Sequence, residues 1–351
     1  MFVALRDIRF ARGRFALMGA VVTMITTLVV FLYGLTGGLA SAASSTVAEL
    51  PADGVVFGAP AGADAEVSFA SSTVTTAQQE RVAAAPGTTA VHPLGVAMTR
   101  LTAPDGAASV SVLGTDAALL PPLSAGAAPK DGEVAVGADT ASAHHLSPGS
   151  QVTLGSQKLT VSAVTAERSL SHAPSVWTTV DTWQQVSGQK QPTALAVRGT
   201  PHDLPADLKA VSRGDALSGI NGYAAEQGSL QLIQGFLFAV SALVVGAFFT
   251  VWTVQRRPDI AVLKAVGASS GYLVRDALAQ AAAVLLAGAL LGGAIGAIGG
   301  AFASAAVPFD VSVSTIAVPV AAMVLLGLAG AALAVRRITA VDPLAALGAN
   351  R

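Results

Sequence analysis

The sequence predicts a membrane protein with four transmembrane helices and a large extracytoplasmic α+β domain between the first and second helix. Of its 351 residues, 52% are hydrophobic and only 12% are charged, whereas roughly a quarter of the residues in a soluble domain are charged. Four apolar runs are long enough to cross a hydrocarbon core about 30 Å thick, which takes roughly 20 helical residues. A polar block of ordinary domain size separates the first run from the other three.

The chain begins with a basic amphipathic segment, residues 1–14, in which "LRDIRFARGR" places arginines beside Leu5, Ile8 and Phe10. We expect it to lie as an elbow helix along the membrane surface. The first span follows at 15–40. Its apolar core of about 24 residues exceeds that of a signal peptide, so we expect a retained anchor, although "ASA" at 40–42 resembles a processing site.

The block at 41–228 is predicted to be the extracytoplasmic domain. "GEVAVGAD", "SQVTLGSQKLTVSAV" and "SVWTTVDTW" alternate apolar and polar residues, as half-buried strands do. "TASAHHL" followed by "SPGS" indicates a short helix and a turn. The neighbouring His144 and His145 lack a carboxylate one helical turn away, so no metal site is expected.

The rest of the chain alternates apolar runs with short polar connections. We assign it as a second span at 229–255, a cytoplasmic segment at 256–271, a third span at 272–304, an outer loop at 305–314, a fourth span at 315–335 and a cytoplasmic tail at 336–351.

Basic residues predict the orientation of these spans. Of the 20 Lys and Arg residues, 11 lie in the N-terminal segment, the 255–275 stretch and the tail, whereas 41–228 holds nine basic and 16 acidic residues. Because Lys and Arg favour the cytoplasmic side, both termini are expected in the cytoplasm of a multi-pass plasma-membrane protein.

The stretch "QRRPDIAVLKAVGAS" at 255–269 is unusually charged for its surroundings. Pro258 suits the first turn of a helix, Asp259 complements the helix N-terminus, and Gly267 suits a left-handed cap. An apolar stripe lies between them, formed by Ile260, Leu263 and Val266. These features predict a short helix on the cytoplasmic surface. A plain turn between two spans is the alternative.

The third span carries small residues at four-residue steps, which bring helix backbones close together. We therefore predict a packing face formed by Gly288, Gly292, Gly296 and Gly300. Gly34 and Gly38 repeat the spacing in the first span.

"RRPDIAVLKAVGAS" and the closing "VRRITAVDPLAALG" resemble the FtsX-like permease domain of ABC transporters of the MacB superfamily, over residues 229–348. The stretch "GEVAVGADTASAHHLSPGSQVTLGSQKLTVSAV" is similar to the family's periplasmic core domain. The resemblance implies a homodimeric permease in the lipid bilayer whose cytoplasmic helix, about 259–268, docks into an ABC ATPase subunit. The coupling residues would be Asp259, Ile260, Leu263, Lys264, Val266 and Gly267.

The sequence contains no G-x-x-x-x-G-K-[ST] phosphate-binding loop. We therefore expect ATP and Mg²⁺ on the partner subunit, and a permease that is not itself an enzyme and has no intrinsic cofactor. Nucleic acid is not an expected partner.

Two further segments, "MFVALRDIRFARGRFALMG" and "GYAAEQGSLQLIQGFL", resemble the haem-exporter (HrtB-like) branch of the family. The function expected from this likeness is ATP-driven export of an amphiphile, foremost haem. Two alternatives stay open. One is export of another drug, peptide or lipid-like substrate, and the other is a mechanotransmitting FtsX-type subunit that regulates an extracytoplasmic cell-wall hydrolase.

Glu226 precedes the second span near the outer membrane boundary, where an ionisable group is costly unless it is solvated or paired. One interpretation is that it ligates the iron of a haem, with Met24 or Tyr33 of the first span as opposing groups. The simpler interpretation is that Glu226 stabilises the N-terminus of the second span.

Overall fold

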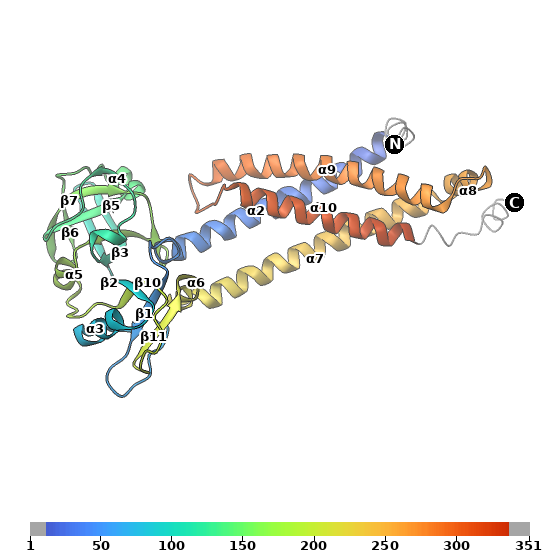
Figure 1. Ribbon diagram of the computed structural model, residues 1–351. Coiled ribbons are helices and arrows are strands. Elements are labelled where there is room, and N and C mark those ends of the chain that lie inside the picture. The colour runs from blue at the N-terminus through green and yellow to red at the C-terminus, as the bar shows by residue number, and fades with distance from the viewer. Residues whose placement is uncertain (1–11, 337–351) are drawn as a thin grey trace. The chain divides into compact units, whose positions relative to one another are not determined.

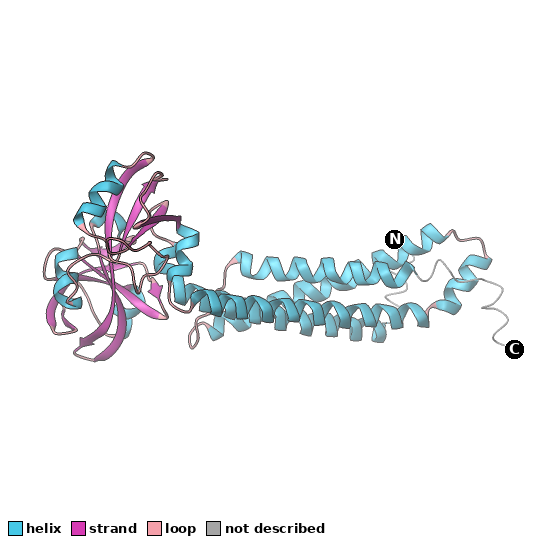
Figure 2. Cartoon of the chain, turned by 90° about the horizontal axis from the view of Figure 1, so that it is seen from below, coloured by secondary structure: helices cyan, strands magenta, loops and turns pink. Residues whose placement is uncertain are grey.

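The computed structural model describes residues 12–336, which form two compact units. The helical unit comprises the chain up to Gly38 and from Ser229 onward, and the sheet unit comprises Leu39–Gly228. Among the described residues, all strands belong to the sheet unit, as Figure 2 shows. The predicted fold class is confirmed: a sheet-rich domain follows the first of four candidate transmembrane helices.

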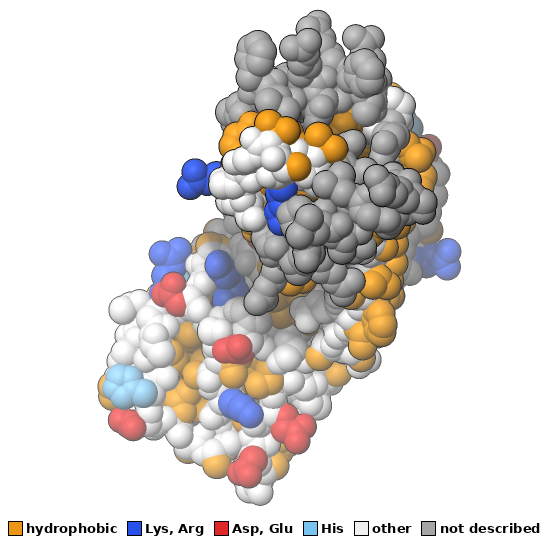
Figure 3. Space-filling view, turned by 90° about the vertical axis from the view of Figure 1, so that its right-hand side faces the viewer, with side chains coloured by type: hydrophobic (Ala, Val, Ile, Leu, Met, Phe, Trp, Pro, Cys, Tyr) orange, Lys and Arg blue, Asp and Glu red, His pale blue; other side chains and the backbone are white. Residues whose placement is uncertain are grey.

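The four helices that are long and apolar enough to cross a membrane are labelled in Figure 1. They are α2 (Arg12–Ala48), α7 (Tyr223–Gln255), α9 (Ser270–Ala303) and α10 (Val313–Arg336). A short helix, α8 (Arg257–Ala265), connects α7 to α9. Figure 3 shows one face of the molecule, on which hydrophobic side chains form extended patches and charged side chains are scattered.

Two helices extend beyond the predicted spans. The first predicted span ends at residue 40, but α2 continues to Ala48, and α7 begins at Tyr223 rather than at residue 229. Val47 is only 1% exposed within a core of the sheet unit, and Tyr223 packs against the same core. Protein packing rather than lipid therefore surrounds these helix ends, which a hydropathy scan does not distinguish.

The other boundaries are close to the prediction. The third and fourth predicted spans begin and end within two residues of the first and last residues of α9 and α10. The predicted elbow at 1–14 and tail at 336–351 lie largely outside the described residues.

Side chains from all four helices form one core in the helical unit. Val29 of α2, Phe249 of α7, Leu285 of α9 and Met323 of α10 are each at most 2% exposed. Between membrane helices such contacts stabilise by close packing, because lipid tails are as apolar as the side chains.

The glycines of the third span face α2. A methyl group added at Gly288 would lie 3.0 Å from Val22, one at Gly292 would lie 2.5 Å from the Thr23 carbonyl oxygen, and one at Gly296 would lie 2.9 Å from Val30. Thr27 Oγ1 donates to the Gly292 carbonyl at 3.1 Å. These distances leave no room for larger side chains along this stretch of α9.

The last glycine of the series has a different neighbour. A methyl group at Gly300 of α9 or at Gly34 of α2 would overlap the Phe309 ring. Phe309 also packs against Phe31, with ring centroids 5.2 Å apart. The loop between α9 and α10 therefore inserts its aromatic side chain between two helices.

The sheet unit contains one 11-stranded mixed sheet with strand order β11-β1-β10-β2-β3-β9-β5-β7-β4; β6 pairs with β2 and β7, and β8 pairs with β9. The β3–β9 and β5–β7 pairs are parallel. The strands are β1 (Gly54–Gly58), β2 (Thr88–Ala103), β3 (Gly106–Gly114), β4 (Leu123–Gly126), β5 (Glu133–Gly137), β6 (Gln151–Leu154), β7 (Gln157–Thr165), β8 (Ser169–Leu170), β9 (Ala173–Thr178), β10 (Ala194–Gly199) and β11 (Leu208–Ser212).

Short helices accompany the sheet: α3 (Thr76–Ala84), α4 (Ala138–Ala143), α5 (Val180–Ser187) and α6 (Arg213–Ala216). The stretch at 175–183, which alternates like a strand, is strand only to Thr178. Thr179 then caps α5, because its side chain accepts the Thr182 N–H at 3.2 Å.

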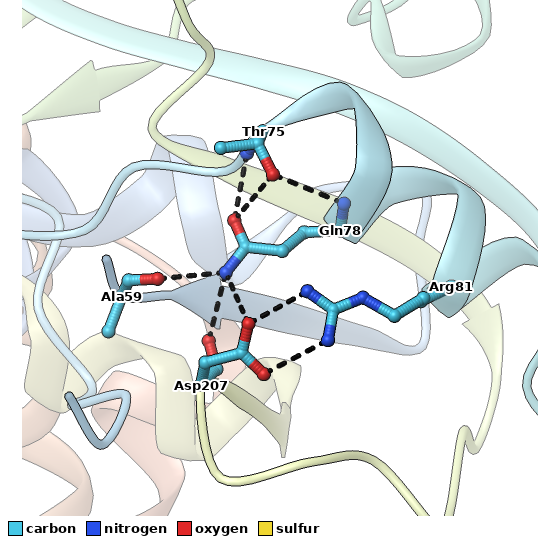
Figure 4. Close-up of polar contacts among 5 residues, drawn as sticks. All are labelled: Ala59, Thr75, Gln78, Arg81 and Asp207. Atoms are coloured by element: carbon cyan, nitrogen blue, oxygen red, sulfur yellow. Dashed lines mark hydrogen bonds and ion pairs between the residues drawn. The ribbon is translucent and has the colours of Figure 1, made fainter. Parts of the chain in front are cut away.

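A buried amide fixes α3 to the segment before β11 (Figure 4). Gln78 is 3% exposed, and its Nε2 donates to the Ala59 carbonyl at 2.8 Å and to Asp207 Oδ2 at 3.0 Å. Arg81 pairs with the same carboxylate at 2.8 Å. The N-terminus of α3 is closed by a capping box between Thr75 and Gln78.

Candidate functional site

The short helix α8 is bounded by the residues that the sequence singled out. Pro258 lies in its first turn. Gly267 has a φ of +100°, its N–H donates to the Lys264 carbonyl at 3.0 Å, and the Ala268 N–H donates to the Leu263 carbonyl at 2.9 Å. This pair of hydrogen bonds is a Schellman cap. It ends the helix at a residue with a left-handed backbone conformation, which only glycine adopts readily.

The two faces of α8 differ in burial. Ile260 and Ala261 are 7% and 2% exposed and face the helical core, whereas Val262, Leu263 and Val266 are 56%, 40% and 84% exposed. Positions three and four apart lie on the same side of a helix, so these three residues form one exposed apolar face. We call Val262, Leu263 and Val266 the α8 apolar face.

The structure differs from the predicted stripe in one respect. The sequence pattern groups Ile260 with Leu263 and Val266, but Ile260 is buried in the helical core and anchors α8 there. Val262 takes its place on the exposed side. Lys264 is partly exposed between them, and the side chain of Asp259 lies outside the described part of the chain.

A polar network lies where α7 ends and α8 begins. Arg256 Nη1 donates to Gln280 Oε1 at 2.6 Å, and Gln280 Nε2 donates to Asp276 Oδ2 at 2.8 Å. The Arg256 guanidinium lies 5.1 Å from the centroid of Trp252, which packs edge-on against Phe15 with centroids 6.2 Å apart. The network therefore joins α7 and α9 through polar groups and adds α2 through aromatic packing.

The proposed substrate residue Glu226 lies in the first turn of α7, within the sheet unit. Its Oε2 is 3.0 Å from Nε2 of His172, and the two side chains are 31% and 45% exposed. The carboxylate therefore already has a partner. The location in the first turn also suits the helix-capping alternative, because negative charge is favourable near a helix N-terminus.

The two candidate opposing ligands lie on different sides of α2. Met24 and Tyr33 are nine positions apart, so they are separated by about 13 Å along the helix and by about half a turn around it. The two side chains therefore cannot hold one iron atom together from the same α2. Met24 is 69% exposed, and Tyr33 is partly buried.

Met24 borders a groove of about 800 Å³ between α2 and α9. The lining is almost entirely apolar, with the threonines Thr23 and Thr27 as exceptions. Its other walls include Leu28, Phe31, Leu291 and Ile295. The volume lies within the range of about 300–1,000 Å³ typical of small-molecule sites. Within residues 12–336, no three His, Cys, Asp or Glu side chains lie close enough together to hold a metal ion.

Both parts of the chain match known family models. The FtsX-like permease C-terminal model matches residues 232–343, and the MacB-like periplasmic core domain model matches residues 16–213, more than half of the chain. This chain belongs to the FtsX/MacB family of ABC transporter permeases.

Relatives within the FtsX/MacB family align over almost the whole length. An uncharacterized ABC transporter permease of Mycobacterium tuberculosis (strain H37Rv) is 30% identical over 99% of each chain. The putative hemin transport system permease protein HrtB of Staphylococcus haemolyticus is 26% identical over 99% of each chain. The solved periplasmic region of MacB from Actinobacillus actinomycetemcomitans is 10% identical, with a TM-score of 0.35, over 48% of this chain and 92% of that one.

Membership of the FtsX/MacB family has two direct consequences. The chain is a membrane protein, and its class of permease works with an ATPase partner.

The side chains that sequence reasoning did not select are Val262, His172 and Arg256. Only Arg256 has a visible signal in the sequence, because it ends an apolar run.

Proposed function

We propose that this permease is the membrane-spanning subunit of an ATP-driven exporter of an amphiphile, foremost haem, and that a separate ATPase binds ATP and Mg²⁺. In this proposal the chain is not an enzyme, two copies form a homodimer in the plasma membrane, and α8 and both termini lie in the cytoplasm. The basic residues that flank α8 and the termini support this orientation.

The observation that carries the proposal is the α8 apolar face. A nine-residue helix is too short to cross a membrane, yet Val262, Leu263 and Val266 present apolar surface on its outer side. Helices with such a face typically lie in a groove of a partner protein. Lys264 lies beside the face and suits an acidic rim of that groove. Ile260 and Gly267 fix the position and the end of the helix.

The substrate assignment is supported by the likeness to HrtB and by the groove between α2 and α9. Met24 contributes a thioether to that groove, and a thioether is an accepted axial ligand of haem iron. Glu226 stays a candidate ligand whose release from His172 is required first. Tyr33 is placed on the opposite side of α2 from Met24, which makes it the weaker partner for a site in this groove.

The test is haem resistance in bacterial cells that lack their own haem exporter. Co-expression of this permease with its ATPase should permit growth in haemin, and an ATPase with a substituted phosphate-loop lysine should not. Met24→Ala should reduce the resistance more than Leu17→Ala, a matched change of an exposed α2 residue outside the groove. Absence of resistance with an intact ATPase, together with ATP-dependent activation of a cell-wall hydrolase, would contradict export and favour mechanotransmission.

A further inference from the structure

Gln280 occupies an unusual position for an amide in a membrane protein. Its side chain is fully buried, at 0% exposed, in the first third of α9. Both ends of the amide are used, since the oxygen accepts from Arg256 and the nitrogen donates to Asp276. A buried polar group away from water is costly unless it is hydrogen-bonded, so the three side chains stabilise one another only as a complete set.

The network closes a ring of contacts around α8. Arg256 precedes the first residue of α8, and the Schellman cap at Gly267 leads directly to Ser269, which caps α9 by accepting the Tyr272 N–H at 3.3 Å. The chain therefore connects Arg256 to α9 through α8, and the side chain of Arg256 connects it to α9 a second time through Gln280. A displacement of α8 cannot separate α7 from α9 without breaking this second connection.

Glutamine is the residue type that this position requires. The amide accepts from a cationic guanidinium and donates to a carboxylate at the same time, and these two roles need an oxygen and an N–H on one side chain. Glutamate at 280 would still accept from Arg256, but it would repel Asp276. Leucine would leave both charged groups without this partner in an apolar region.

We propose that the Arg256–Gln280–Asp276 network passes the displacement of α8 to α9, so that Gln280 is a positioning residue for energy coupling. This proposal rests on the proposed function, because an ATPase must displace α8. The new element is the route: the displacement of α8 reaches α9 through Gln280 and not only through the turn at 266–269. The glycine face of α9 would then carry the movement to α2.

The movement of α9 can be measured without knowledge of the substrate. The chain has no cysteine, so spin labels can be attached at Ile298→Cys on α9 and Val240→Cys on α7, both of which are more than half exposed. The labelled permease is diluted with unlabelled chain, assembled with the ATPase and measured with and without ATP by pulsed electron paramagnetic resonance. The wild-type background should show an ATP-dependent shift in the distance distribution.

Gln280→Leu should abolish the shift and lower transport of a haemin probe per ATP hydrolysed by about tenfold, while the ATPase still co-purifies. Asp276→Asn should preserve the shift, because asparagine retains an acceptor oxygen. Gln234→Leu is the matched control, since Gln234 bridges α7 to Thr36 of α2 away from α8. Arg256→Ala combined with Gln280→Leu should be no worse than either change alone, as expected for one shared connection.

An unchanged ATP-dependent shift in Gln280→Leu would overturn the proposed connection, as would an equal loss in Gln234→Leu. A wild-type complex that shows no shift although it binds the ATPase would overturn it as well. If the wild-type permease instead fails to bind any ATPase, the proposed function fails, and that failure is seen in co-purification before any distance is measured.

Discussion

The imidazole Nε2 of His172 lies 3.0 Å from Oε2 of Glu226, and this pair joins a hairpin tip to the first turn of α7. Ser171 and His172 form the two-residue turn between β8 and β9, with φ values of 52° and 61°. Their N–H groups donate to the carbonyls of Ala43 and Ala42 at 2.9 and 3.0 Å. Within the sheet unit, the hairpin tip thus contacts both α2 and α7.

Positive φ at both turn positions favours Asn-Gly over Ser-His. We predict that Ser171→Asn/His172→Gly keeps the hairpin and stabilises the protein by up to about 1 kcal/mol through relief of left-handed strain.

The same double substitution frees the Glu226 carboxylate from His172, so the affinity for haemin, followed by the Soret band, should rise. Glu226→Gln combined with this pair should cancel the rise. Equal haemin binding by all three proteins would remove Glu226 from the substrate site.

The glycine face of α9 gives a prediction about packing. In Gly292→Ala the new methyl group would lie 2.5 Å from the Thr23 carbonyl oxygen, which belongs to the backbone of α2 and cannot rotate away. We expect a loss of about 1–3 kcal/mol in the free energy of unfolding, as for other overpacked contacts. The measurement is reversible unfolding of the purified protein in mixed micelles.

Gly299→Ala is the matched control on the same helix, because a methyl group there meets no atom within 4 Å. It should be neutral, since alanine also has the higher helix propensity. Similar destabilisation by both changes would show that the α2–α9 packing is looser than the structure indicates.

The contact between α3 and Asp207 predicts a pH dependence. The hydrogen bond from Arg81 is the main cause that lowers the pKa of the Asp207 carboxyl below its ordinary value of 3.8, and Gln78 adds to it. A lowered folded-state pKa contributes stability that is present above the ordinary value and is lost as pH falls through the folded-state value. The protection of the α3 amides against hydrogen exchange, expressed relative to the intrinsic exchange rate at each pH, should therefore fall below about pH 4.

Asp207→Asn should remove this acid-dependent step, and α3 should exchange faster already at neutral pH. Asp203→Asn is the control, because Asp203 is exposed in the same connection and its φ of 60° suits asparagine as well. If α3 exchange responds to acid equally in all three proteins, Asp207 does not control the attachment of α3.

The proposed orientation can be tested with the cysteine-free chain. Ser156→Cys lies in the exposed β6–β7 turn, and Ala265→Cys is exposed at the end of α8. In intact cells an impermeant maleimide should label position 156 but not position 265, and both should react once the membrane is permeabilised. The reverse pattern would invert the assigned topology.

Sequence reasoning works best in this protein where local rules decide the structure. Pro258 and Gly267 predict the limits of α8 because helix starts and left-handed caps are local events. Apolar runs likewise predict four spans. Local pattern fails at the end of α2 and the start of α7, which belong to the sheet unit and pack in its core instead of lipid. It also fails at 179–183, where a capping threonine starts α5 within an alternating stretch.

The hydrogen-bond partners of the candidate site residues could not be predicted from the sequence. Glu226 and His172 are 54 positions apart, and Gln280 and Arg256 are 24 apart. These pairs depend on how the hairpin and the helices pack, and no periodicity encodes that packing. Ile260 and Val262 illustrate the same point, because the pattern shows an apolar stripe on α8 but not which side faces the helical core.

The most direct test of docking through α8 is the affinity of the purified full-length permease for its ATPase. Val266 at the C-cap of α8 and Val313 at the start of α10 are 84% and 83% exposed, so Val266→Asp and Val313→Asp change equally accessible side chains. If the α8 apolar face is the docking surface, Val266→Asp should weaken ATPase binding by about tenfold or more, because an unpaired charge would be buried in the interface. Val313→Asp should leave the affinity within about twofold. Equal affinities for both variants and the wild type would contradict docking through α8.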